Sequence, residues 1–296
     1  MNTTGKEVAF DVVVVGSANL DLVATLDHLP KPGETIVALD YAEHAGGKGV
    51  NQAVACARMG ARTAFVGCVG NDDAGIFLRG VLENEGIDTT MLRVVDMPTG
   101  RAFINVDSRG ENEIVVVSGA NTQVGVAQNP LVLPTSRVLL MQLEIPLATV
   151  SAALTLARRS GTLTVLNPAP YKSLTEDVLS LVDVIVPNET ESAACGGTNA
   201  LLKAGVATVV TTLGEKGAVI NTASSETSIA PHKVVAVDTV GAGDAFIGAL
   251  SAELARGAAI SDAASVGAVA GALATTVHGA VPSLPKQDVV RKAMGK

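Results

Sequence analysis

A single acidic residue that follows a glycine-rich turn is the clearest candidate for chemistry in this chain. Residues 238–250 read Asp-Thr-Val-Gly-Ala-Gly-Asp-Ala-Phe-Ile-Gly-Ala-Leu, so the turn Gly241-Ala242-Gly243 delivers Asp244 into the first turn of an apolar helix. Backbone N–H groups at a helix start have no intrahelical partner and can hold an anion. Without Cβ atoms, the two glycines let a phosphoryl group approach. The pattern predicts a base that deprotonates an alcohol beside an anion hole.

A second glycine-rich turn lies at residues 46–51, Gly-Gly-Lys-Gly-Val-Asn, just before a predicted helix. Lys48 and Asn51 offer hydrogen-bond donors for hydroxyl groups. The sequence has no Walker A pattern, and no GxGxxG follows a predicted strand, so a nicotinamide dinucleotide is not supported. The four histidines lack metal-ligand spacing, and no Gly-x-Ser-x-Gly elbow indicates a hydrolase.

The elements that must position these residues alternate between strands and helices. Short continuous apolar runs are typical of parallel strands covered on both faces. The predicted strands are 10–15, 63–69, 138–141, 163–166, 182–186 and 207–211, and the predicted helices are 50–59, 73–85, 245–254 and 263–277. This alternation predicts an α/β protein with a doubly wound sheet.

Polar residues follow five of the predicted strands, where each strand ends. In open parallel sheets, ligands bind at the carboxyl ends of the strands. Taken singly, such residues are more often helix caps or turn formers, and Asn188 is an example. Together they predict a binding site at this edge. They are Asn19, Asp21, Glu144, Asn167, Asn188, Glu191, Thr212 and Gly214.

Two regions, 22–43 and 99–117, lack helical patterns and read as extended. A turn at 108–112 separates strands predicted at 102–106 and 113–117. These pieces would form a small sheet that covers the cleft as a lid within a single domain spanning 1–296. An additional hairpin at the edge of the main sheet is the alternative.

Composition excludes several classes of partner. Hydrophobic residues make up 48% of the chain, aromatic residues only 2%, and the net charge is −8, which argues against nucleic acid. Three cysteines without CxxC spacing are expected to be reduced, buried thiols. Asp11 interrupts the first apolar stretch, and the uncharged residues 263–277 are too short to span a bilayer. We therefore expect a cytoplasmic protein with no membrane partner.

The two glycine-rich turns also carry a resemblance to a known family. Residues 46–55 and 238–244 resemble the two signatures of the ribokinase (PfkB-type) family of sugar kinases. Further motifs of that family fall in the expected order, and the resemblance extends from about residue 11 to 285. They are Gly-Ser-Ala-Asn-Leu-Asp at 16–21, Pro-Gly-Glu-Thr at 32–35, Gln-Leu-Glu at 142–144, Asn-Pro-Ala-Pro at 167–170, Pro-Asn-Glu-Thr-Glu at 187–191, Thr-Leu-Gly at 212–214 and Gly-Ala-Val-Pro-Ser at 279–283.

The resemblance implies a ribokinase-like doubly wound, mostly parallel sheet flanked by helices, with a small β-sheet lid. It implies transfer of the γ-phosphate of ATP, with Mg²⁺, to the 5-hydroxyl of D-ribose. It also implies a homodimer formed through the lid. Asp244 matches the catalytic base, and 241–243 match the anion hole. The positions that match ribose contacts are Asn19, Asp21, Gly46, Gly47, Lys48, Asn51, Ala102, Ile104, Glu144 and Asp244.

The same resemblance implies positions for the nucleotide and for the cations. Asn188 and Glu191 match the element that organises Mg²⁺, through water. Asp238, Val240 and Ser283 match the monovalent-cation (K⁺) site, and Val240 stands where threonine is common in the family. The positions that match ATP contacts are Asn188, Thr212, Gly214, Gly217, Gly243 and His278.

Two other functions remain open on the sequence. The same chemistry could act on deoxyribose, a ketohexose or a nucleoside, although Asn19, Asp21 and Glu144 together favour free ribose. A non-catalytic sugar-binding regulator could retain the same fold. Such a protein would be expected to have lost the acid, the anion hole or the pair that organises Mg²⁺, and all three are present here.

Overall fold

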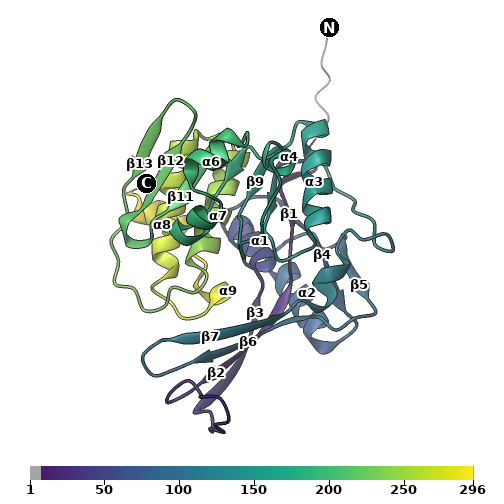
Figure 1. Ribbon diagram of the computed structural model, residues 1–296, viewed down its shortest axis with the longest axis vertical. Coiled ribbons are helices and arrows are strands. Elements are labelled where there is room, and N and C mark those ends of the chain that lie inside the picture. The colour runs from purple at the N-terminus through teal and green to yellow at the C-terminus, as the bar shows by residue number, and fades with distance from the viewer. Residues whose placement is uncertain (1–7, 296) are drawn as a thin grey trace.

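The computed structural model describes residues 8–295 and contains two sheets of unequal size (Figure 1). The larger sheet has nine strands in the order β13-β12-β11-β10-β9-β8-β1-β4-β5. Its pairs are parallel except for β11–β12 and β12–β13, which are antiparallel. The strands are β1 Phe10–Val15, β4 Thr63–Gly70, β5 Leu92–Val95, β8 Ser136–Met141, β9 Leu163–Leu166, β10 Val184–Ile185, β11 Thr208–Thr212, β12 Ala218–Asn221 and β13 Glu226–Ile229.

Helices cover both faces of the large sheet because its strands are apolar on both sides. Alternate residues of a strand point to opposite faces, so Val12 and Val14 of β1 enter one core while Val13 and Val15 enter the other. The helices are α1 Lys48–Arg58, α2 Asp73–Asn84, α3 Leu147–Ser160, α4 Glu176–Leu179, α5 Glu189–Ala194, α6 Thr198–Lys203, α7 Ala242–Ala255, α8 Ile260–Ala274, α9 Ala280–Ser283 and α10 Gln287–Ala293.

The first core contains side chains of α1, α2, α7, α8 and α10, and the second contains side chains of α3, α4 and α6. The prediction of a doubly wound, mostly parallel sheet with a second small sheet is confirmed. The ends of the predicted strands and helices in this part differ from the observed ends by at most three residues. The chain order reverses at β1, which lies between β4 and β8, and such a switch point creates a crevice at the carboxyl ends of the strands.

The second sheet projects from one end of the molecule (Figure 1). Its four strands, in the order β3-β2-β6-β7, are β2 Asn19–Thr25, β3 Asp40–Gly46, β6 Gly100–Val106 and β7 Asn112–Val117. The first segment, expected at 22–43, differs from the strands observed, since β2 begins at Asn19 and β3 continues to Gly46. Only three residues separate β1 from β2, too few for local patterns to show that a new strand begins there.

Asp72, the N-cap of α2, ties the small sheet to the large one. Its carboxylate accepts hydrogen bonds from the backbone N–H of Gly75 and from both the N–H and the hydroxyl of Thr99, just before β6. The Thr99 hydroxyl oxygen also accepts the N–H of Gly70 at the end of β4. These bonds fix the point at which the chain leaves the core for the small sheet.

Two expectations from composition are also addressed by the structure. Between residues 8 and 295, no helix is both long and apolar enough to cross a membrane. Cys56 and Cys68 are buried and unpaired, as expected. Cys195 differs because it is only half-buried; it lies at the end of α5, whose outer residues Ala193 and Ala194 are exposed.

Candidate active site

Segments that are far apart in the sequence meet at the carboxyl edge of the large sheet. Glu144 follows β8, and its carboxylate accepts the hydroxyl of Ser17, which follows β1, at 2.5 Å. The same carboxylate accepts the backbone N–H of Lys48 at 3.0 Å. Glu144 therefore holds the start of α1 against the ends of two neighbouring strands.

Asp244 reaches this edge from the first turn of α7 and is buried, with 7% of its surface exposed. The side-chain amide of Asn51 donates to Oδ2 at 2.9 Å, and the amide of Gln52 donates to Oδ1 at 2.8 Å. Each carboxylate oxygen therefore has one amide donor and keeps further lone-pair capacity for a substrate proton. The Oδ1 atom of Asn51 is buried without a hydrogen-bond partner in the described chain, which suits a hydroxyl donor from a ligand.

The glycines before Asp244 shape the N-terminus of α7. Gly241, the N-cap, has φ 79°, a left-handed conformation that favours glycine. A Cβ atom at Gly241 would lie 3.1 Å from the Cα of Ala280 in α9, so this turn packs tightly. A Cβ atom at Gly243 would meet no heavy atom within 4 Å. The first turn of α7 therefore faces open space at Gly243, where an anion can approach the free N–H groups.

Three carboxylates interact near this helix start. Burial, together with the charges of Glu144 and Asp244, raises the pKa of Asp21 to about 7. Asp21 lies in β2, opposite Ala102 of β6, so the small sheet brings its carboxylate to the core. A Cβ atom at Gly46 would lie 2.0 Å from Oδ2 of Asp21, so only glycine fits beside that side chain.

Lys48 supplies the positive charge within this group. Burial lowers the pKa of its ammonium, but the charges of Asp244, Glu144 and Glu191 outweigh burial and the net shift is upward. An ammonium surrounded by carboxylates stays charged and can donate to hydroxyl or phosphate oxygens. Its interaction with Glu191 also connects the sugar-side residues to those expected to serve the nucleotide.

The rest of the expected sugar side is built around Asn19, the first residue of β2. Its Oδ1 accepts a hydrogen bond from the amide of Asn121 at 2.7 Å. A Cβ atom at Gly47 would lie 2.9 Å from the Asn19 backbone nitrogen, so Gly47 lets α1 pack against this strand. Ala102 and Ile104 alternate along β6 and share the face of the small sheet that carries Asp21.

The expected nucleotide side follows β10 and β11. Asn188 caps α5 by accepting the Glu191 N–H at 2.7 Å, and Glu191 accepts the Asn188 N–H at 2.9 Å. Both residues therefore have the capping role that the sequence left open for Asn188. Thr212 lies beside Asn188 through a bridge between the two chain segments. Gly214 and Gly217, with φ 57° and 89°, form the turn between β11 and β12.

The residues present can hold Mg²⁺ only indirectly. In the described part of the chain, no group of three or more His, Cys, Asp or Glu side chains is placed to hold a metal ion. Glu191 uses one carboxylate oxygen in its capping bond and retains the other. Mg²⁺ in kinase sites keeps several waters and binds one or two carboxylates together with substrate phosphates, so this donor set fits such an ion.

The residues expected at the monovalent-cation site lie where the loop before α7 meets α9. Asp238 accepts the N–H groups of Val240 and Gly279, at 2.9 and 2.8 Å. The Ser283 hydroxyl donates to the carbonyl of Ala280 and lies beside Gly241. His278 borders this group, since its Nδ1 lies 3.7 Å from the Asp238 carboxylate, while 80% of its side chain is exposed.

Buried amides behind Asp244 include two, Gln52 and Gln142, for which no role was predicted, and Asn167, which was predicted only as one of the polar residues at the strand ends. Gln142 donates to Gln52 at 2.6 Å, and Gln52 donates to Asn167 at 3.2 Å. All three side chains are buried. The signal available was weak: Gln52 follows Asn51 in the glycine-rich segment, and Gln142 and Asn167 directly follow predicted strands.

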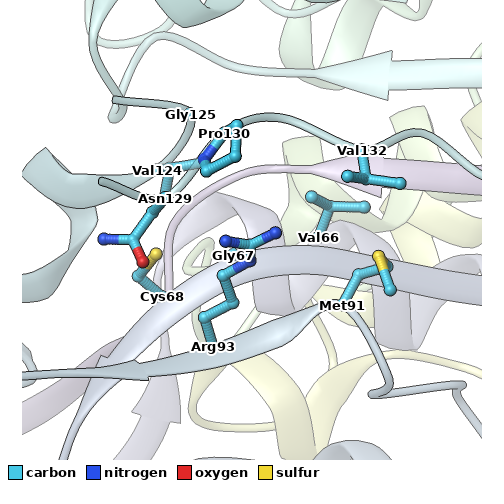
Figure 2. A pocket seen from close by; sticks show the side chains of 10 residues that line it. All are labelled: Val66, Gly67, Cys68, Met91, Arg93, Val124, Gly125, Asn129, Pro130 and Val132. Atoms are coloured by element: carbon cyan, nitrogen blue, oxygen red, sulfur yellow. The ribbon is translucent and has the colours of Figure 1, made fainter. Parts of the chain in front are cut away.

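A separate cavity lies between β4, β5 and the loop that follows the 3₁₀ turn at residues 119–123 (Figure 2). Figure 2 shows Cys68 and Asn129 at one end, Val66, Met91 and Val132 at the other. The residues that line it include none of the predicted site positions. The candidate site is therefore defined by the hydrogen-bonded carboxylates at the strand ends and not by this cavity.

Comparisons with known proteins agree with this arrangement. Residues 9–287 match the family model described as pfkB family carbohydrate kinase. The ribokinase of Haemophilus influenzae is 40% identical over 293 residues, which cover 94% of this chain and 96% of that protein.

Solved structures give the same result. The ribokinase of Thermotoga maritima superimposes with a TM-score of 0.86 at 36% identity, covering 96% of this chain and 99% of the other. The Arabidopsis thaliana ribokinase complexed with ribose and ATP gives a TM-score of 0.85 at 30% identity, covering 96% and 98%. On this evidence, the chain belongs to the pfkB family of carbohydrate kinases.

Proposed function

We propose that this protein phosphorylates D-ribose at its 5-hydroxyl with ATP, giving ribose 5-phosphate. Relatives that are 34–40% identical over nearly the full length are ribokinases, which supports ribose as the acceptor. The observation that carries the proposal is the buried carboxylate of Asp244, which has an amide donor on each oxygen. It directly follows Gly243, where the first turn of α7 faces open space. That is the geometry required to take a proton beside a developing phosphoryl charge.

In the proposed reaction, the sugar hydroxyl oxygen attacks the γ-phosphorus while the bond from that phosphorus to the bridging oxygen of ADP breaks. Asp244 takes the hydroxyl proton. The N–H groups of Gly241, Gly243 and Asp244 and the N-terminal dipole of α7 stabilise charge on the transferring oxygens, whereas the Ala242 N–H already donates to the carbonyl of Thr239 at 3.3 Å. Mg²⁺, held through water by Glu191 and Asn188, would neutralise charge on the nucleotide phosphates.

The sugar would be held by groups that the two sheets bring together. Asp21 and Asn19 come from the small sheet, whereas Glu144, Lys48 and Asn51 come from the core. A substrate lacking one hydroxyl would leave a buried partner without a hydrogen bond, which discriminates strongly between sugars. Ala102 and Ile104 would contact the apolar face of the ring. Closure of the small sheet as a lid would exclude water from the transfer.

On the nucleotide side, we propose that Thr212, Gly214 and Gly217 contact ATP together with Asn188 and the N–H of Gly243. Gly214 supports this, because a Cβ atom there would meet no heavy atom within 4 Å, so its backbone is open to a ligand. Gly217 closes the same turn, with its N–H donating to Gly214 and its carbonyl accepting from Leu213. His278 is proposed at the edge of the adenine, since 80% of its side chain is exposed and accessible to a base.

The loop around Asp238 is proposed as a K⁺ site. A carboxylate that accepts two N–H groups keeps lone pairs for a cation, and Val240 offers its carbonyl instead of a side-chain oxygen. Ser283 would complete the site. We expect ribose phosphorylation to rise with K⁺ when choline keeps the ionic strength constant. A rate that does not respond to K⁺ would contradict this assignment.

We propose a homodimer formed through the small sheet. In β7, the edge strand, Ile114, Val115, Val116 and Val117 are between 48% and 55% exposed. Alternate residues point to opposite faces, so both faces at this edge are apolar. A second copy of the chain would cover them. Sedimentation should show a dimer, and Val115→Lys should shift it toward monomer; a monomeric parent protein would overturn the proposal.

The decisive experiment is a screen of acceptors with the purified protein. ATP, Mg²⁺ and either ribose, deoxyribose, fructose or inosine are incubated with it, and ADP release is followed together with the position of the new phosphate. We expect the highest kcat/KM for ribose, with phosphate on the 5-oxygen. A higher value for another acceptor would reassign the substrate, whereas ribose binding without ADP release would indicate a regulator.

Because the donor is ATP, we place the activity in the cytoplasm.

A further inference from the structure

A chain of buried amides lies directly behind the proposed base. Gln142, which follows β8, donates its Nε2 to Oε1 of Gln52 at 2.6 Å. Gln52, in α1, donates its Nε2 to Oδ1 of Asp244 at 2.8 Å. Gln52 and Gln142 have no exposed surface. Neither glutamine is among the residues proposed above to bind sugar or nucleotide.

The direction of this chain follows from the charge at its end. An ionised carboxylate only accepts hydrogen bonds, so the Gln52 atom that faces Asp244 must be the amide nitrogen. The Gln52 oxygen then faces Gln142, which must present its own nitrogen. Asn167 fixes Gln52 from a third side, because its Oδ1 accepts from Gln52 at 3.2 Å while its Nδ2 donates to the carbonyl of Val186 at 3.0 Å.

The amide of Gln52 is therefore held by groups from three separate elements: α7, the end of β8 and the end of β9. It uses both hydrogens and its oxygen, so it cannot rotate without losing hydrogen bonds in a site shut off from water. Gln142 is less satisfied, since its own Oε1 is buried without a partner in the described residues. An apolar side chain at this position would avoid the cost of burying an unpaired oxygen. The protein nevertheless has a glutamine here, and that glutamine is linked to Asp244 through Gln52.

Resting on the proposed function, we infer that Gln52 is a positioning residue for the transfer, and that Gln142 acts through it. Gln52 holds the carboxylate of Asp244 in the rotamer that presents a free lone pair to the sugar hydroxyl. Asn51 binds the other oxygen, but the proposed function already assigns it to the sugar. Gln52 acts on the base alone, so its loss should slow the reaction without weakening ribose binding.

Methionine replaces glutamine with an unbranched side chain of similar size and no donor. We would measure kcat, the KM for ribose and ATP, and ribose affinity by calorimetry for Gln52→Met, Gln142→Met and the double variant. Gln52→Met should lower kcat by about 10- to 100-fold, because misplacing a reacting group slows chemistry steeply. Ribose affinity should stay within about threefold, a split that a general structural defect would not produce.

The double variant tests whether Gln142 works through Gln52. Gln142→Met should lower kcat less than Gln52→Met does, and the double variant should match Gln52→Met alone, since residues in one hydrogen-bond network are not additive. Ser251→Ala is the matched control, because Ser251 lies in α7, is buried and has a hydroxyl without a partner in the described residues. It should leave kcat unchanged.

A kcat for Gln52→Met within twofold of the parent would overturn the inference, and so would a loss of ribose affinity equal to the loss of kcat. Additive effects in the double variant would overturn the role of Gln142. If Gln52→Met does not fold, Gln142→Met decides by the same split. If the parent phosphorylates a different sugar, the proposed function is wrong while this inference is tested on that sugar. A parent without kinase activity contradicts both.

Discussion

The N-terminus of α7 and the small sheet contribute to one proposed pocket but are packed in opposite ways. Asp244 is 7% exposed and accepts hydrogen bonds from two buried amides, of which Gln52 is also bonded to Gln142 and Asn167. In β7, by contrast, the large apolar side chains stand about half exposed on both faces. The core region is surrounded by buried neighbours. The inner end of the small sheet is fixed by the bonds at Asp72 and Thr99 and by the burial of Ala45 and Ala102, whereas its outer part is held by hydrogen bonds along its strands.

This difference separates two requirements of the reaction. A base must be held within a fraction of an ångström of the proton that it takes, which demands a dense hydrogen-bonded surrounding. A cover must open and close for each turnover, which demands few packed contacts with the core. Asp21 connects the two regions, because it belongs to the small sheet while its charge interacts with Glu144 and Asp244 of the core.

We expect the strongest effect of any single substitution at Asp244. We expect Asp244→Asn to lower kcat by roughly 10²–10⁴-fold, the usual contribution of a positioned base, while ribose affinity changes little. Steady-state kinetics and calorimetry measure the two effects separately. Near-normal turnover in this variant would show that the densely packed region does not carry the chemistry.

Matched truncations test the difference in packing. Leu140 of β8 is fully buried, and we expect Leu140→Ala to lower the free energy of unfolding by about 2–5 kcal/mol. Ile114 of β7 is 51% exposed, and Ile114→Ala should change it by no more than about 0.5 kcal/mol in dilute, monomeric protein. Urea unfolding measures both. An equal loss in the two variants would remove the distinction, and a loss at Ile114 seen only at high concentration would locate the dimer contact.

Gly243→Ala tests whether the start of α7, in the core region, binds the anion. The added methyl group meets no atom, and alanine favours helix, so melting temperature should not fall. It would nevertheless occupy space before the free N–H groups, and we expect kcat/KM for ATP to fall by about tenfold. Gly241→Ala is the contrast, because at φ 79° it should lower stability as well. Unchanged ATP kinetics in Gly243→Ala would place the anion elsewhere.

The last expected effect is on pH dependence, at the residue that joins the two regions. The pKa of Asp21 is raised to about 7, so between its ordinary value near 4 and pH 7 the folded state binds more protons than the unfolded state. Stability from this group is present at low pH and is lost as pH rises through that window. Relative to Asp21→Asn, the ligand-free parent should lose at least about 1 kcal/mol between pH 4 and 7 in urea unfolding.

A parallel pH dependence for parent and Asp21→Asn would mean that Asp21 is neither buried nor crowded by the two core carboxylates. It would then contradict the close approach of the small sheet. Glu43→Gln is a suitable control, because Glu43 is an exposed carboxylate of the same sheet, in β3.

Local patterns were enough to predict much of the fold. Continuous apolar runs such as 10–15 and 163–166 need burial on both faces, which only a covered parallel sheet provides, and both are strands with those bounds. Strands shorter or more polar than these were harder to delimit. β10 has only two residues where five were expected, because just Val184 and Ile185 pair with both neighbouring strands.

The candidate site also contains some parts that local patterns predict and others that they do not. The glycine-rich turns can be recognised from a few neighbouring residues, since Gly241 adopts a backbone conformation that other residues avoid. The amides that hold Asp244 carry no such local mark. Gln52 and Gln142 are separated by 90 residues and meet only because α1 packs over the carboxyl end of β8.

Local patterns were enough to predict the layers, the glycine-rich turns and an acid directly after one of them, because backbone freedom and hydrophobic periodicity are properties of neighbouring residues. The side chains that surround that acid, and the place of Asp21 of the small sheet among the charges of the core, depend on tertiary contacts. Hydrogen bonds and charge interactions act over a few ångströms through space, and the distance along the chain says nothing about which groups will come that close.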